Sequence, residues 1–143
     1  MAQRPPTVAP TPGGDNLGRQ HILVVDDDVN TLSLVERVLA NYRVSAAHDG
    51  LQALAMLSAD GPVDLLLTDY LMPVMTGEEL ARRARVIQPT VKILVMTGYA
   101  NAVTVADPEW CAAERLLGKP FRIEALRRAV EELIGPPREL GDT

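Results

Sequence analysis

The chain has 143 residues, of which 47% are hydrophobic and 23% charged, so it can bury one core and has the composition of a globular domain. Its net charge of -5 argues against nucleic acid as the primary partner, because a phosphate backbone is met by an excess of Lys and Arg. A lone cysteine, Cys111, cannot form an internal disulfide, and the sequence offers neither a spanning apolar stretch nor a secretory leader. We therefore expect a cytoplasmic protein with no membrane partner.

Residues 1–18 are rich in Pro and Gly with almost nothing to bury, which predicts a disordered lead. Beyond them, short apolar runs alternate with amphipathic stretches. The apolar runs predict strands over 22–25, 43–47, 63–68, 91–96 and 115–117. The amphipathic stretches predict helices over 29–40, after Asp49, from about Gly77, and over 122–134. Residues 136–143 begin with two prolines that end the last helix, and form a short tail.

Strands that alternate with helices imply a parallel sheet covered on both faces. The pattern favours an α/β domain over residues 20–135, with a five-stranded parallel sheet in a flavodoxin-like, doubly wound (βα)5 fold. In the third helix, the spacing of Leu80, Ala84 and Ile87 predicts that all three face the core.

Polar side chains follow four of the five predicted strands, where ligands of such sheets bind. They are Asp26, Asp27 and Asp28 after the first strand, Asp69 after the third, Thr97 after the fourth and Lys119 after the fifth. Acids this close together repel unless a cation joins them, and the hard cation Mg²⁺ suits carboxylate ligands. With a hydroxyl and a mobile ammonium group beside them, these residues suit phosphoryl transfer to a carboxylate.

Four motifs occur in order on the matching strands: VVDDD at 24–28, DLLLTDYLMPVMTG at 64–77, MTG at 96–98 and GKPF at 118–121. Together they resemble the receiver domain of two-component response regulators, over roughly residues 20–135. The chain is similar to stand-alone, single-domain receivers and to receivers at the ends of hybrid sensor kinases.

This resemblance implies that Asp69 accepts a phosphoryl group from the phosphohistidine of a histidine kinase or phosphotransfer protein. It also implies that Asp26, Asp27 and Asp69 hold Mg²⁺, Asp27 directly and Asp26 partly through water. Leu71 would lend its backbone carbonyl to the same ion. By the same resemblance, the chain catalyses only its own phosphorylation and dephosphorylation, and is otherwise not an enzyme.

The resemblance further implies that Thr97 swings toward the phosphoryl oxygen and that Lys119 pairs with the acids. The peptide bond between Lys119 and Pro120 would be cis. The switched domain would regulate a downstream protein that the sequence does not identify, without contacting nucleic acid directly. Monomer and homodimer both stay open.

Two positions and one stretch of the sequence depart from the usual receiver pattern. Leu116 stands where many receivers carry an aromatic switch residue, and Gly98 follows Thr97 where Ala is commoner. The stretch 100–114 is poorly suited to a helix, because Pro108 interrupts it. We therefore expect this stretch to be the part that moves on phosphorylation and carries the output, without a rotamer change at Leu116.

Other functions compete with this interpretation. The spacing Asp26-x-Asp28-x-x-Thr31 is close to the opening motif of haloacid-dehalogenase enzymes, with Thr97 and Lys119 in place of their later motifs. That family needs an acidic pair on a strand end after the lysine, and this sequence has none there. A DNA-binding regulator without its output domain and a passive pseudo-receiver are two further alternatives; the acidic charge disfavours the first and the complete Asp, Thr and Lys set the second.

Several polar residues have structural explanations. Asp28 is expected to cap the first helix; Asp26 and Asp27 are the alternatives for this role. The two histidines, His21 and His48, lie away from any ligand spacing and are expected to be structural or exposed. Trp110 and Cys111 are expected to be packing or surface residues rather than functional ones.

Overall fold

The computed structural model describes residues 18–59, 61–98 and 115–138. The lead up to residue 17, the end of the tail, and residues 99–114, which include the expected moving stretch, lie outside the described residues.

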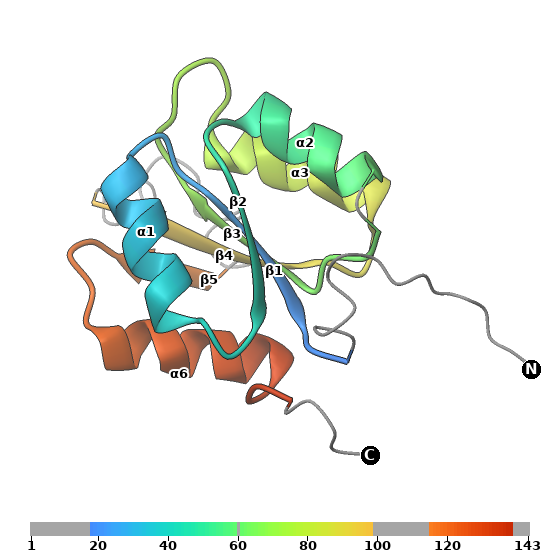
Figure 1. Ribbon diagram of the computed structural model, residues 1–143. Coiled ribbons are helices and arrows are strands. Elements are labelled where there is room, and N and C mark those ends of the chain that lie inside the picture. The colour runs from blue at the N-terminus through green and yellow to red at the C-terminus, as the bar shows by residue number, and fades with distance from the viewer. Residues whose placement is uncertain (1–17, 60, 99–114, 139–143) are drawn as a thin grey trace, which may run out of the picture.

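Five strands and four helices make up the described part of the chain (Figure 1). The strands are β1 (His21–Val25), β2 (Arg43–Ala47), β3 (Leu65–Asp69), β4 (Lys92–Thr97) and β5 (Arg115–Gly118). The helices are α1 (Val29–Val38), α2 (Gly50–Ala59), α3 (Gly77–Ile87) and α6 (Ile123–Ile134). Within these described ranges, no helix combines the length and the apolar character needed to cross a membrane.

The strands form one parallel sheet in the order β2-β1-β3-β4-β5, which confirms the predicted fold class. In the register of this sheet, Val25 at the end of β1 lies between Ala47 of β2 and Thr68 of β3. Helices α2 and α3 cover one face of the sheet, and α1 and α6 cover the other (Figure 1). Because all the strands are parallel, their five carboxyl ends lie at the same edge of the sheet.

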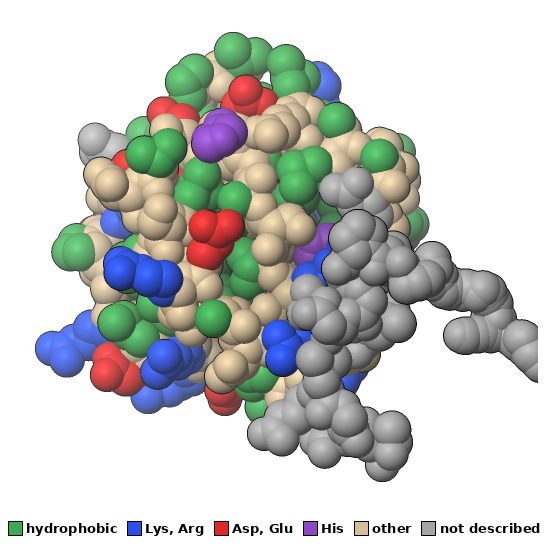
Figure 2. Space-filling view, viewed as in Figure 1, with side chains coloured by type: hydrophobic (Ala, Val, Ile, Leu, Met, Phe, Trp, Pro, Cys, Tyr) green, Lys and Arg blue, Asp and Glu red, His purple; other side chains and the backbone are tan. Residues whose placement is uncertain are grey.

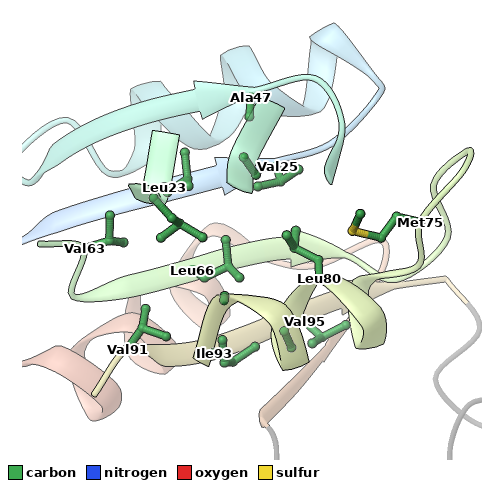
Figure 3. Packing of buried hydrophobic residues seen from close by; sticks show 14 of the residues in the cluster. Leu23, Val25, Ala47, Val63, Leu66, Met75, Leu80, Val91, Ile93 and Val95 are labelled. Atoms are coloured by element: carbon green, nitrogen blue, oxygen red, sulfur yellow. The ribbon is translucent and has the colours of Figure 1, made fainter. Parts of the chain in front are cut away.

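The core consists of two apolar clusters, one on each face of the sheet. Successive strand residues alternate between them: Leu66 packs toward α2 and α3, whereas Leu65 and Leu67 pack toward α1 and α6. Figure 3 shows the first cluster, with Leu23 and Leu66 on the same side of the sheet. Because both faces are buried, the strands have continuous apolar sequences rather than alternating ones.

The starts of α1 and α2 are fixed by acidic caps. Asp28 Oδ1 accepts a hydrogen bond from the backbone N–H of Asn30 at 2.9 Å, which confirms the predicted capping role of Asp28. Asp49 Oδ1 accepts from the N–H of Gln52 at 2.8 Å, and so caps α2. Each cap ends the turn that follows a strand, so both define loops at the carboxyl edge of the sheet.

The observed boundaries differ from the predicted ones by one or two residues at the ends of most elements. One packing prediction was wrong: Ile87, expected to face the core, is 37% exposed. Gln88 points inward instead, because its Oε1 accepts from the Val63 N–H at 2.7 Å and its Nε2 donates to two backbone carbonyls. A polar side chain with three backbone partners can fill a position where the pattern predicts an apolar one.

At the opposite edge of the sheet, buried Gln20 joins the start of β1 to the end of α6. Its Nε2 donates to the carbonyls of Ile134 at 3.1 Å and Pro136 at 2.8 Å, while its Oε1 accepts from the Arg138 N–H at 3.1 Å. The Tyr42 hydroxyl donates to the Gly135 carbonyl at 2.8 Å. We call these contacts the terminal clamp.

The two histidines have the structural or exposed positions expected of them. His21 is buried, with Nδ1 3.1 Å from the Pro62 carbonyl oxygen and Nε2 2.8 Å from the Ser45 hydroxyl oxygen. His48 is exposed in the turn between β2 and α2. Within the described part of the chain, neither histidine belongs to a group of side chains whose geometry could hold a metal ion.

Candidate acidic site at the strand ends

The strand order of the sheet changes direction at β1. From β1 the chain passes to β2 on one side, whereas the next strand, β3, lies on the other side of β1. The loops after β1 and β3 therefore diverge, which is where doubly wound sheets bind ligands. Asp26 follows directly after β1, and Asp69 is the last residue of β3.

Three carboxylates converge at this point of the sheet edge. Asp26, Asp27 and Asp69 each offer an oxygen, and these oxygens all lie within 4.8 Å of one another. Asp26 is buried, Asp69 is half-buried and Asp27 is exposed. The cluster thus has a closed side and a side open to solvent, as a site that takes up a hydrated ion requires.

Lys119 reaches into the cluster from the end of β5. Its Nζ lies 2.9 Å from Asp26 Oδ2 and 3.4 Å from Asp69 Oδ1. The other oxygen of Asp26 accepts from the Asp28 N–H at 2.9 Å, so both oxygens of this buried carboxylate are hydrogen-bonded. The peptide bond from Lys119 to Pro120 is cis, as the resemblance implied.

The surroundings shift the pKa of two of these ionisable groups, Asp69 and Lys119. Burial raises the pKa of the Asp69 carboxyl, the positive charge of Lys119 opposes that rise, and the charge of Asp26 adds to it. Burial alone lowers the pKa of Lys119, but the hydrogen bond and charge of Asp26, together with Asp69, outweigh it and raise the pKa overall. The lysine is therefore held in its charged form, while ionised Asp69 is less stable than a carboxylate in water.

Thr97 lies at the same edge, one strand away from Asp69. In the register of β3 and β4, Asp69 pairs with Met96, and Thr97 is the next residue, buried and paired with Gly118 of β5. The Thr97 carbonyl accepts from the Lys119 N–H at 2.8 Å, which fixes the backbone from which Lys119 extends. The structure thus places Thr97 and Lys119 on adjacent strand ends beside the acids.

The loop after β3 contains two features that sequence patterns alone did not reveal. Gly77 N–H donates to the Tyr70 carbonyl at 2.7 Å, and a Cβ at Gly77 would lie 2.5 Å from the Asp69 carbonyl oxygen. Only glycine fits so close a backbone approach, so Gly77 positions the end of β3. Val74 has a positive φ of 74° and is 92% exposed.

The donor set of this acidic site fits Mg²⁺. Hard divalent cations are held by one or two carboxylates, with further positions taken by water, backbone carbonyls and phosphate oxygens. Exposed Asp27 and half-buried Asp69 offer such oxygens beside open solvent, while Asp26 is already engaged by Lys119. Leu71, predicted to lend its carbonyl, lies two residues beyond Asp69 in the same loop.

Fold and site together define a doubly wound α/β protein with an acidic cluster and a lysine at its topological switch point. Comparison with known proteins agrees: the model of the response regulator receiver domain matches residues 22–131. The chain belongs to the response regulator receiver family of two-component signalling systems, whose members act as phosphoacceptor switches and interact with histidine kinases or phosphotransfer proteins.

Two relatives are similar over nearly their whole length. The response regulator receiver protein CpdR of Brucella abortus is 35% identical over 117 residues, which cover 80% of this chain and 97% of the relative. Sporulation initiation phosphotransferase F of Bacillus subtilis is 32% identical over 117 residues, 80% of this chain and 94% of the relative.

Among solved structures, the receiver domain of the sensor histidine kinase PA1611 from Pseudomonas aeruginosa superposes with a TM-score of 0.69 and 29% identity, covering 82% of this chain and 98% of that one. That structure holds a magnesium ion in its active-site cleft.

Proposed function

We propose that this chain is a phosphorylation-activated receiver whose phosphoacceptor is Asp69. The observation that carries the proposal is the position of the Asp69 carboxylate at the end of β3, with the Lys119 ammonium group at 3.4 Å and the two acids that follow β1 close by. No other acid in the described part of the chain combines a strand end, partial burial and a cationic partner in this way.

In the proposed reaction, an Asp69 carboxylate oxygen attacks the phosphorus atom of a phosphohistidine. The new O–P bond forms as the P–N bond breaks, and the electron pair returns to the imidazole of the donor. Burial makes ionised Asp69 a stronger base than a solvated carboxylate, and the Lys119 charge lies where the negative phosphoryl oxygens arrive. The same lysine keeps Asp26 neutralised throughout.

Asp26, Asp27 and Asp69 would hold Mg²⁺, together with the Leu71 carbonyl, and the bound ion would offset charge on the phosphoryl oxygens. Asp27 is the exposed member of the set and so the natural direct ligand. Asp26 is already hydrogen-bonded to Lys119 and to the Asp28 N–H, which favours contact between Asp26 and the ion through a water molecule.

Thr97 is the proposed switching residue. Its hydroxyl is on the strand end next to Asp69, so a small movement would bring it to a phosphoryl oxygen. The backbone after Thr97 leads directly into residues 99–114, so this movement would pull on the stretch that we propose to carry the output. The half-buried Leu116 cannot supply the hydrogen-bonding aromatic side chain that many receivers use.

The proposed partners are a histidine kinase or phosphotransfer protein upstream and a protein target downstream, within the cytoplasm. We further propose that residues 20–135 form the receiver, that residues 1–18 and 136–143 flank it, and that the chain does not hydrolyse phosphate esters. Sustained turnover of a phosphomonoester would contradict the last point and support the dehalogenase-type alternative.

The experiment is incubation with acetyl phosphate and Mg²⁺, followed by intact-mass measurement. The wild-type chain should gain one phosphoryl group and lose the gain when Mg²⁺ is chelated, whereas Asp69→Asn should gain none. Asp28→Asn is the matched control, since Asn still caps α1 and Asp28 is outside the cluster. Full labelling of Asp69→Asn would exclude Asp69 as the acceptor.

A further inference from the structure

We propose that a hollow between the β2–α2 turn and the β3–α3 loop is a docking site for the protein that delivers the phosphoryl group. The occupant would be an aliphatic side chain of that protein, flanked by Lys or Arg. This inference rests on the proposed function, since it assigns a recognition surface to the partner of the same site.

The hollow has a volume of about 280 Å³. Met75 and Gly50, two of its lining residues, are buried, and a Cβ at Gly50 would lie 2.7 Å from Met75 Sδ. The residues that line it are Asp27, His48, Asp49, Gly50, Leu51, Pro73, Val74 and Met75. Any side chain at Gly50 would collide with Met75, so glycine here lets Met75 keep its place in the lining of the hollow.

Val74 on the rim combines two unfavourable features. Its φ of 74° lies in the left-handed region, which is strained for a β-branched residue. Its side chain is also 92% exposed, so packing within the chain does not offset that strain. Both features have an explanation if the valine is buried by a partner, because strained residues and exposed apolar side chains concentrate at binding surfaces.

The chemistry of the rim specifies the occupant. Leu51, 57% exposed, lines the hollow together with Val74 and makes its surface partly apolar. Asp27 and Asp49 add negative charge, and no Lys or Arg is among the described residues that line it. Figure 2 shows this face, with hydrophobic side chains gathered over the loop between β3 and α3 and acidic and histidine side chains directly below them. An aliphatic side chain with basic neighbours complements this surface.

The position of the hollow identifies the occupant as the phosphodonor protein. Asp27 belongs both to the hollow and to the acid cluster around Asp69. A protein that presents a phosphohistidine to Asp69 must therefore cover the same edge of the sheet. A second copy of this chain is the competing occupant, and the experiment below separates the two.

The test uses Val74→Asn, because Asn tolerates a positive φ and removes the exposed methyl groups. The donor is the autophosphorylated histidine kinase, from a purified panel of the source organism's kinases, that labels the wild-type chain fastest. We expect KM for the chain in this transfer to rise roughly tenfold, while labelling by acetyl phosphate stays unchanged. The thermal midpoint should rise by about 4 °C as the strain is relieved. Val86→Asn, which alters an 82% exposed valine on α3, is the matched control and should leave KM unchanged.

Asp49→Asn tests whether the negative charge of Asp49 attracts basic residues of the partner. Asparagine retains the cap of α2, so only the charge is removed. It should raise KM for the kinase by a fewfold at low salt and by less at high salt. Unchanged KM in both variants, labelling by acetyl phosphate but by no kinase, or a wild-type dimer that Val74→Asn dissociates would each overturn the inference. Failure of the proposed function would look different, because acetyl phosphate would then not label the wild-type chain.

Discussion

Lys119 and Asp26 form the most buried charge pair of the acidic site. Asp26 is 1% exposed, and its Oδ2 has the Lys119 ammonium group at 2.9 Å. A buried carboxylate without a cation is costly, because the interior solvates charge poorly. The lysine therefore has two effects: it stabilises the fold around Asp26, and its positive charge competes with any metal ion for the same acids.

Lys119→Met should separate these effects. Methionine keeps most of the aliphatic volume but leaves Asp26 without its partner, so the free energy of unfolding should fall by about 3 kcal/mol. The same change should tighten Mg²⁺ binding, since a nearby positive charge is lost, and should slow phosphorylation. Chemical denaturation and a calorimetric Mg²⁺ titration measure the first two. Unaltered stability together with weaker Mg²⁺ binding would show that Lys119 does not have this role.

Individual residues of the acidic site were predictable because each polar side chain directly follows an apolar run. The run fixes the strand, and parallel strands bring their ends to one edge. Neither Val74 nor Gln20 could be predicted in this way. The positive φ of Val74 contradicts the preference of its residue type, and the partners of Gln20 lie more than a hundred residues away along the chain.

Contacts within the β3–α3 loop hold the end of β3, which carries Asp69, against the start of α3. Thr76 caps α3 by accepting from the Glu79 N–H at 3.1 Å, and Gly77 follows in contact with the Asp69 backbone. The helix start and the strand end are thus fixed against each other. A displacement of this loop would move the Asp69 carboxylate relative to Lys119.

Gly77→Ala should therefore impair the site through the backbone. The added Cβ would lie 2.5 Å from the Asp69 carbonyl oxygen, a clash that outweighs the helix propensity gained from alanine. We expect a net loss of about 1 to 2 kcal/mol in stability and slower labelling by acetyl phosphate. Gly118→Ala, where a Cβ meets nothing within 4 Å, is the control. Wild-type labelling by Gly77→Ala would argue against this positioning role.

The elements themselves could be predicted well, since strands buried on both faces have continuous apolar sequences and α1 and α2 begin at recognisable caps. Element ends were less predictable, because hydrogen bonds from distant residues decide them. Gln88 illustrates the limit: its amide bonds to the backbone near α2 and β3 put a polar residue in the position where periodicity favoured Ile87.

The terminal clamp joins the two ends of the described domain at the edge opposite the site. Burial, together with the charge of Glu131, raises the pKa of Tyr42 from 10.0 to about 12. The unfolded chain thus releases this proton at lower pH than the folded chain. Stability contributed by protonated Tyr42 is present below about pH 10 and is lost as pH rises toward about 12.

Tyr42→Phe should lower the free energy of unfolding by about 1 kcal/mol at neutral pH, because the Gly135 carbonyl loses its donor. The variant should also lose less stability than the wild type between pH 10 and about 12. Denaturation curves across this range measure both effects. Equal pH dependence in the two proteins would mean that the Tyr42 hydroxyl is not held as described.

Chemical mapping of the modified residue decides whether Asp69 alone receives the phosphoryl group. Borohydride reduces an aspartyl phosphate to homoserine, which peptide mass analysis locates in the sequence. After labelling with acetyl phosphate and Mg²⁺, we expect homoserine at position 69 and at no other aspartate. Homoserine at position 26 or 27, or a stable phosphoryl group on another residue type, would contradict it.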